Sequence, residues 1–312
     1  METLIEKRSA EAFEQIMKVS SDIKNSYKLI DTSTAKYLVD TYYQVQKSRI
    51  ITGNQIFWQS KTEEPCALLI FTHNNLRIIE KNLYNALSIY AKHQPIYQWL
   101  STICGIGPVI SAGLIANIDI TKVNTAGQIW SYAGLVPGKD HLVKGQKSPY
   151  NKTLKTLCWK IGQSFVKVSN NPKDFYGKIY KERKKYEIEL NTQGKYSDQA
   201  KIALSRLVKK TTDTYKANTA GMLSDGHIQR RSERYATKIF LSHLFTVWYE
   251  MANHKLPPKP FAIAILGHKD EILVPNWDED LFVTLDPSPA KDETLIGDTS
   301  KTGPINLKDD ED

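Results

Sequence analysis

Apolar residues recur at intervals of three, four and seven along most of the chain, which is the pattern of amphipathic helices. In the first third, this pattern predicts helices over residues 3–30 and 33–58, and a third helix that begins near Pro65 and runs through Tyr90. The polar run Asp31–Thr34 separates the first two helices and offers N-cap residues for the second. Long amphipathic helices joined by short turns predict a helical hairpin or coiled-coil arm, which either dimerises or folds into an intramolecular bundle.

A glycine turn marks a change of character after the arm. Gly105 and Gly107 precede Pro108, and small or apolar residues follow as far as Ala116. Both glycines allow positive φ and close backbone approach, and Pro108 suits the first turn of a helix. The exposed N–H groups at that helix start can hold a phosphate, so the run resembles a helix-hairpin-helix element, which grips the nucleic-acid backbone. A purely structural turn is the alternative.

Lysines gather in the next loop, from Gly138 to Tyr150, and at the start of the helix that follows it. Lysines beside an aromatic ring suit phosphate contacts combined with stacking, and Tyr150 is the stacking candidate. The alternative is a surface loop with ordinary lysines. The lysines concerned are Lys139, Lys144, Lys147, Lys152 and Lys155.

The rest of the helical pattern is also basic. It predicts helices over residues 172–191, from a cap at Ser197 onward, and between His227 and His254, with a loop at 218–226. Cations four residues apart on the last of these form one exposed stripe, which suits a groove or backbone contact unless neighbouring acids pair with it. The candidate contacts of this region are Lys184, Lys185, Arg230, Arg231, Arg234 and Lys238.

Charge divides the chain unevenly. The 312 residues carry a net charge of +8, but the segment from Asp270 onward holds 13 acidic residues against three lysines, so residues 1–269 carry +18. A body this basic attracts polyanions. The acidic end either covers the basic surface or serves solubility. We expect a mainly α fold in three parts: an arm over 1–94, a nucleic-acid-binding domain over 95–268, and an acidic, largely disordered tail over 269–312.

Several classes of protein and of site are not indicated. No run of about 18 apolar residues predicts a membrane span, and the start of the chain has no export signal. The cysteines are far apart and lack metal-ligand spacing, which suits a reducing cytoplasm. Metalloprotease, hydrolase-elbow, Walker and dinucleotide-binding motifs do not occur. We therefore expect no metal, no cofactor and no catalytic residue; Asp119 and Asp140 are interpreted as caps or salt-bridge partners, and Ser148 as an ordinary serine.

Three runs in fixed order, GIGPVISAGLIANI, IWSYAGLVPG and NKTLKTLCW, resemble the C-terminal domain of insertion-sequence transposases guided by a bridge RNA. The later NPKDFYGKIYKERKK and DQAKIALSRLVKK fit its continuation, so the resemblance covers roughly residues 95–250. Two features of that family are missing: helices stand in place of its N-terminal RuvC-like domain with four acidic metal ligands, and the stretch Lys139–Gly145 lacks its nucleophilic serine.

A helical arm before such a domain is similar to the Tas proteins of tandem-interspaced-guide-RNA systems, some of which carry no nuclease. That resemblance implies a homodimer that binds a guide RNA and directs it to complementary target DNA, with any cleavage left to a separate nuclease. A transposase with divergent catalytic residues, and a helical scaffold without a nucleic-acid role, are the alternatives.

Overall fold

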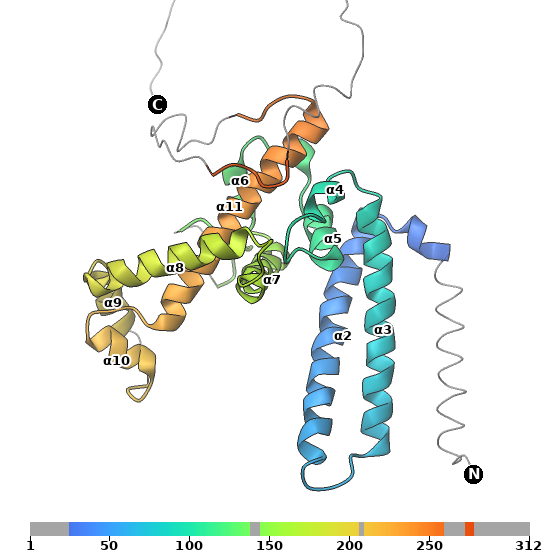
Figure 1. Ribbon diagram of the computed structural model, residues 1–312, viewed down its shortest axis with the longest axis horizontal. Helices are drawn as coiled ribbons and strands as arrows, with labels where there is room; N and C mark the ends of the chain where they lie inside the picture. The colour runs from blue at the N-terminus through green and yellow to red at the C-terminus, as the bar shows by residue number, and fades with distance from the viewer. Residues whose placement is uncertain (1–24, 138–143, 206–208, 259–271, 278–312) are drawn as a thin grey trace, which may run out of the picture. The chain divides into compact units, whose positions relative to one another are not determined.

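A computed structural model describes residues 25–137, 144–205, 209–258 and 272–277 of the chain. Every regular element in these ranges is helical, which confirms the predicted mainly α fold (Figure 1). The elements are η1 (Asn25–Leu29), α2 (Thr32–Gln59), α3 (Ala67–Lys92), α4 (Tyr97–Leu100), α5 (Pro108–Asn117), η2 (Ile120–Lys122), α6 (Ala126–Tyr132), α7 (Lys152–Val168), α8 (Tyr176–Thr192), α9 (Ser197–Leu204), α10 (Asp213–Thr219) and α11 (Asp225–Asn253).

Helices α2 and α3 lie side by side as an antiparallel hairpin (Figure 1). Asp31 caps α2 as predicted, because its side chain accepts a hydrogen bond from the Thr34 N–H (2.7 Å). Pro65 lies two residues before α3 and so does not open that helix. Across the hairpin, Arg49 of α2 forms a salt bridge with Glu80 of α3.

Helix α5 is the centre of the packing. All of its residues are buried except Pro108 and Ile110, and it contacts α2, α3 and α7. Gly113 makes this close approach possible, since a Cβ atom at that position would lie 2.8 Å from Leu157 of α7 and 3.4 Å from Val39 of α2. The hairpin is therefore anchored at its base on the same helix that supports α7.

The turn before α5 agrees with the sequence in part. Gly105 has a positive φ of 90°, and Pro108 is the first residue of α5, as predicted. Gly107 does not use the positive φ that its residue type allows: it has φ −90° and takes an extended conformation as the residue that precedes the helix. Helix α4 has only four residues. The glycine turn is therefore preceded by a short helix of about one helical turn and not by a long helix.

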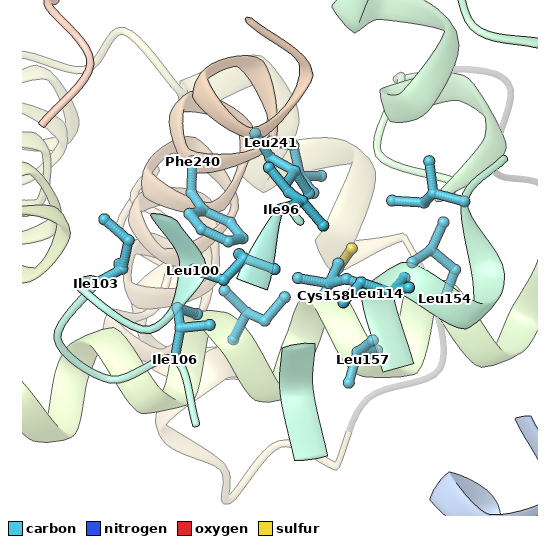
Figure 2. Close-up of a cluster of buried hydrophobic side chains, with 14 of the residues drawn as sticks. Ile96, Leu100, Ile103, Ile106, Leu114, Leu154, Leu157, Cys158, Phe240 and Leu241 are labelled. Carbon is cyan, nitrogen blue, oxygen red and sulfur yellow. The ribbon is translucent and has the colours of Figure 1, made fainter. Parts of the chain in front are cut away.

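The long helix α11 packs against α6, α7 and α8. Side chains from α4, α5, α7 and α11 meet in one core, shown in Figure 2 by Leu100, Leu114, Leu157 and Phe240. The described segment 272–277 closes over this core, where Trp99 Nε1 donates to the Pro275 carbonyl (2.8 Å).

Three local expectations near the later helices need correction or refinement. Gly194, with φ 75°, ends α8 as predicted. Ser197 is the first residue of α9, and Tyr196 occupies the cap position expected for that serine. Helix α10 was not predicted, because a seven-residue helix made mostly of polar residues gives little periodicity. The predicted domain limits at 94 and 268 stay predictions, and the second lies outside the described residues.

Candidate nucleic-acid interface

Helix α7 has one apolar and one cationic face. Its apolar positions, including Leu154, Leu157, Ile161 and Phe165, are buried in the core, and Asn151 caps its start by accepting a hydrogen bond from the Leu154 N–H (3.0 Å). The helix contains no aspartate or glutamate. Its four lysines are therefore not neutralised from within the helix, and they are Lys152, Lys155, Lys160 and Lys167.

Two of these lysines lie over aromatic rings from outside α7, and a tryptophan of α7 lies beside an arginine of α11. The Lys155 ammonium lies 4.2 Å from the centroid of the Tyr150 ring, and the Lys160 ammonium lies 3.7 Å from that of Tyr43 in α2. The Arg230 guanidinium of α11 lies 5.4 Å from the ring of Trp159, which is 50% exposed. We call Tyr150, Lys152, Lys155, Trp159, Lys160, Lys167 and Arg230 the α7 face.

The position of the Tyr150 ring is fixed by its contacts with Gly134 and Ser148. A Cβ atom at Gly134, which has φ 65°, would lie 2.7 Å from the Tyr150 ring, so only glycine lets the ring pack there. The chain before the ring is fixed by Ser148, whose hydroxyl donates to the Tyr150 carbonyl (2.8 Å). The predicted stacking residue is thus half-buried and fixed in position.

Burial and like charge act together on two lysines. Desolvation, and then the charge of Lys167, lower the pKa of Lys160. Desolvation, and then the charge of Arg234, lower the pKa of Lys238, whose ammonium lies 5.3 Å from the Trp130 ring. A nearby phosphate would favour the charged form of both lysines.

The predicted stripe on α11 is present, with different exposure along it. Arg230 and Arg234 are exposed, whereas Lys238 is half-buried. Arg230 also pairs with the buried Glu233 of the same helix (2.6 Å). The stripe therefore reaches the α7 face through Arg230 and Trp159.

Arg231 has a structural partner that the sequence did not reveal. Its guanidinium donates to the buried carboxylate of Glu187 in α8 (2.8 Å), which also accepts from Arg183 (2.6 Å) and from the Tyr196 hydroxyl (2.5 Å). We call Arg183, Glu187, Tyr196 and Arg231 the Glu187 cluster. The cations of this cluster hold α8 against α11.

The other predicted contacts are spread over the described surface. Gly105 packs against Ser164 and Val168, so the glycine turn lies at the end of α7 opposite to Lys152. Lys185 of α8 is exposed, and Lys184 lies over the Tyr180 ring. Lys144 and Lys147 are exposed. Lys139 lies outside the described residues, as do Asp140 and the acidic end of the chain.

Sequence reasoning missed Trp159, Lys160 and Tyr43. A usable signal was present for the first: Trp159 stands at a position of α7 whose helical neighbours are polar, and a large aromatic side chain there must be exposed. Tyr43 carried no such signal, because its pairing with Lys160 depends on how α2 packs against α5.

The described residues give no support to metal or membrane chemistry. Within them, no group of three or more His, Cys, Asp or Glu side chains is placed to hold a metal ion. No described helix is long and apolar enough to cross a membrane. Asp119 caps η2 and pairs with Lys122 (2.8 Å), in agreement with its predicted role.

Residues 97–177, from α4 to the start of α8, match the sequence model of the family described as "Transposase IS116/IS110/IS902 family". The matched segment contains the glycine turn, the lysine loop and all of α7. It covers 81 of the 312 residues, so it supports the family resemblance for this segment of the chain. No curated protein and no solved structure is significantly similar to the chain.

Proposed function

We propose that the chain binds a guide RNA and, as a ribonucleoprotein, presents it to complementary target DNA without cleaving the DNA itself. The observation that carries the proposal is the α7 face, where four lysines have no acidic neighbour on their helix and two of them, Lys155 and Lys160, lie over aromatic rings. Ammonium groups that neutralise phosphates, beside rings on which bases stack, are the usual means of holding single-stranded nucleic acid.

The division of labour follows from this chemistry. Lysine–phosphate contacts and stacking on aromatic rings carry little sequence information. Base pairing between guide and target would therefore supply specificity, while the protein holds the backbone. The glycine turn, Lys144, Lys147, Lys184 and Lys185 are additional proposed contacts.

A second candidate function is that of a transposase acting in DNA transposition. The match of residues 97–177 to the transposase family favours it specifically. It requires Mg²⁺-dependent cleavage or joining of strands, with carboxylates supplied by the rest of the chain or by a partner. Incubation of the pure protein with its flanking DNA and Mg²⁺ tests it, and reproducible strand cleavage would favour this candidate over the first.

The arm supports the further proposal of a homodimer. The part of the hairpin far from α5 exposes large apolar side chains, among them Phe57 (57%), Trp58 (65%) and Leu68 (70%). Exposed apolar groups of this size, gathered at one end of a helical hairpin, are typical of association surfaces. We propose cytoplasmic action, which the three free cysteines support, and a separate nuclease partner where cleavage follows targeting.

The test is expression with the native flanking DNA, purification, and sequencing of the co-purifying RNA, with light scattering to give the mass of the particle. We expect a short, discrete RNA species on a protein dimer. In binding assays with that RNA, the double variant Lys152→Gln, Lys160→Gln should lower the salt dependence of log K by about 2, because each lysine–phosphate contact contributes about 1.

The matched control is Lys209→Gln, Lys210→Gln, which removes the same charge from exposed lysines between α9 and α10. If both double variants lower affinity and salt dependence equally, binding depends on net charge and the α7 face has no special role. If the wild-type protein co-purifies without RNA and binds none in solution, the proposed function is wrong.

A further inference from the structure

A groove separates α2 of the arm from the first half of α7. Its volume is about 600 Å³, which is within the range of roughly 300–1,000 Å³ typical of small-molecule sites. One wall is supplied by Val39, Tyr43, Lys47 and Ile51 of α2, and the other wall by Lys152, Thr156, Leu157 and Lys160 of α7. The groove therefore joins the α7 face to the arm.

The charge of the groove favours an anionic occupant. Lys47, Lys152 and Lys160 line it against a single carboxylate, that of Asp40. Within the described ranges, none of these three lysines forms a salt bridge. Lys160 is half-buried over the Tyr43 ring, and its pKa is lowered by desolvation and by the charge of Lys167. A half-buried ammonium without a carboxylate is stabilised by an incoming anion.

A small inorganic anion would leave most of the groove unused. Val39, Ile50, Ile51 and Leu157 give its lining an apolar character, and Ile50 and Ile51 are 47% and 46% exposed. The best occupant combines a phosphate with a flat, poorly hydrated group. An unpaired nucleotide has both, whereas a duplex keeps the faces of its bases stacked inside.

We propose that the groove between α2 and α7 binds one unpaired nucleotide of a single-stranded nucleic acid, with its base against the apolar lining and its phosphate beside the lysines. This inference rests on the proposed nucleic-acid function. It goes further by giving the arm a direct role in binding: α2 supplies half of the site, so the arm selects for unpaired chain as well as offering an association surface.

The test blocks the groove without changing its charge. Thr156 is exposed on α7, lines the groove, and uses its hydroxyl only to donate to the Lys152 carbonyl in the previous turn (3.0 Å). Thr156→Trp should fill the groove. The matched control is Thr72→Trp on α3, where an exposed threonine makes the same bond to the Leu68 carbonyl (2.8 Å) and lies outside the groove.

The probes are fluorescent oligouridine and oligothymidine of about 12 nucleotides, a length typical of single-strand sites, and a duplex of the same length. Thr156→Trp should weaken binding of both single strands about tenfold, as expected from the loss of one stacked base, and change duplex binding less than about twofold. Loss on the uridine probe alone also supports the site and shows that it distinguishes a uridine nucleotide from a thymidine nucleotide.

Equal losses on single strand and duplex, or binding by Thr156→Trp that matches Thr72→Trp, would overturn the inference. Ile51→Ser is the second variant should Thr156→Trp not fold, and it should weaken single-strand binding because it removes part of the apolar lining. Failure of the proposed function looks different, since the wild-type protein would then bind none of the three probes.

Discussion

Two basic regions of this molecule look alike in sequence and differ in structure. The Glu187 cluster places two guanidiniums around a carboxylate that is 1% exposed, and a tyrosine hydroxyl completes the arrangement. The α7 face has four lysines on a helix without acids, and two of them, Lys155 and Lys160, lie over aromatic rings. In the first region the protein supplies the anion to both cations. In the second, Arg230 pairs with Glu233, whereas Lys152, Lys160 and Lys167 form no salt bridge within the described residues.

The density of cations therefore does not identify a binding surface. In the Glu187 cluster, hydrogen bonds from Tyr196, Arg231 and Arg183 lower the pKa of Glu187 against the opposing effect of burial, so the carboxylate stays charged. On the α7 face, desolvation and then the charge of Lys167 lower the pKa of Lys160. What distinguishes the two is the partner of each cation.

The largest effect is expected from removal of the anion in the first region. Glu187→Ala would leave Arg183 and Arg231 facing each other at the α8–α11 contact and remove the partner of the Tyr196 hydroxyl. Breaking a buried ion pair costs about 3–5 kcal/mol, and we expect about 3 because both guanidiniums keep some contact with solvent. Urea denaturation measures the free energy of unfolding.

The control for that measurement is Glu182→Ala, which removes an exposed acid from the same helix. RNA affinity per folded molecule should be unchanged in Glu187→Ala. A loss of affinity at unchanged stability would show that the Glu187 cluster belongs to the binding surface, and the comparison between the two regions would fail.

The two regions should respond differently to acid pH. A buried histidine of α11, His243, lies in the core, whereas the residues that define the α7 face include no histidine. His243 Nδ1 accepts from the Tyr176 hydroxyl (2.9 Å) and Nε2–H donates to the Ile272 carbonyl (2.8 Å), and burial lowers its pKa to about 4. Between about pH 4 and 6.5 the unfolded chain binds the proton and the folded chain does not, so stability rises with pH.

This histidine should therefore lower the free energy of unfolding by about 2 kcal/mol when the pH falls from about 7 to about 5. Because burial also lowers the pKa of His227, the comparison is made with His243→Gln, which should be less stable overall and lose most of this pH dependence. A wild-type stability independent of pH in this window would contradict the assigned state of His243.

The sequence predicted the helices well and the partners of the charges poorly. Helical periodicity, the Asp31 cap and the positive φ of Gly105 are local properties, and a local pattern is enough to find them. The extended conformation of Gly107 is also local, but a glycine permits both conformations, so residue type alone could not choose between them.

The candidate site was predicted only where its residues are close in sequence. Lys152, Lys155 and Tyr150 lie within six positions of each other, and the structure brings them together. The separation between Arg231 and Glu187 is 44 positions, and that between Lys160 and Tyr43 is 117, so only the packed chain shows these pairs. The adjacent residues Arg230 and Arg231 look equivalent in the sequence, although Arg231 faces α8 and Arg230 faces Trp159.

That pair of adjacent arginines gives the finest test of the comparison. Arg231→Gln should destabilise the fold by about 1–2 kcal/mol, because Glu187 keeps Arg183 and Tyr196 as partners, and it should leave RNA affinity nearly unchanged. Arg230→Gln should cost less stability than Arg231→Gln, since its guanidinium is exposed and the buried Glu233 keeps the Gln229 amide as a donor (2.8 Å). It should lower RNA affinity about threefold and reduce the salt dependence of log K by about 1, as for one lost phosphate contact.

Because the two variants remove the same charge from neighbouring positions of α11, opposite outcomes in the two assays can only come from their different partners. The reverse pattern, with Arg231→Gln losing affinity and Arg230→Gln losing stability, would assign the binding surface to the α8 side of α11 and remove the α7 face from that role.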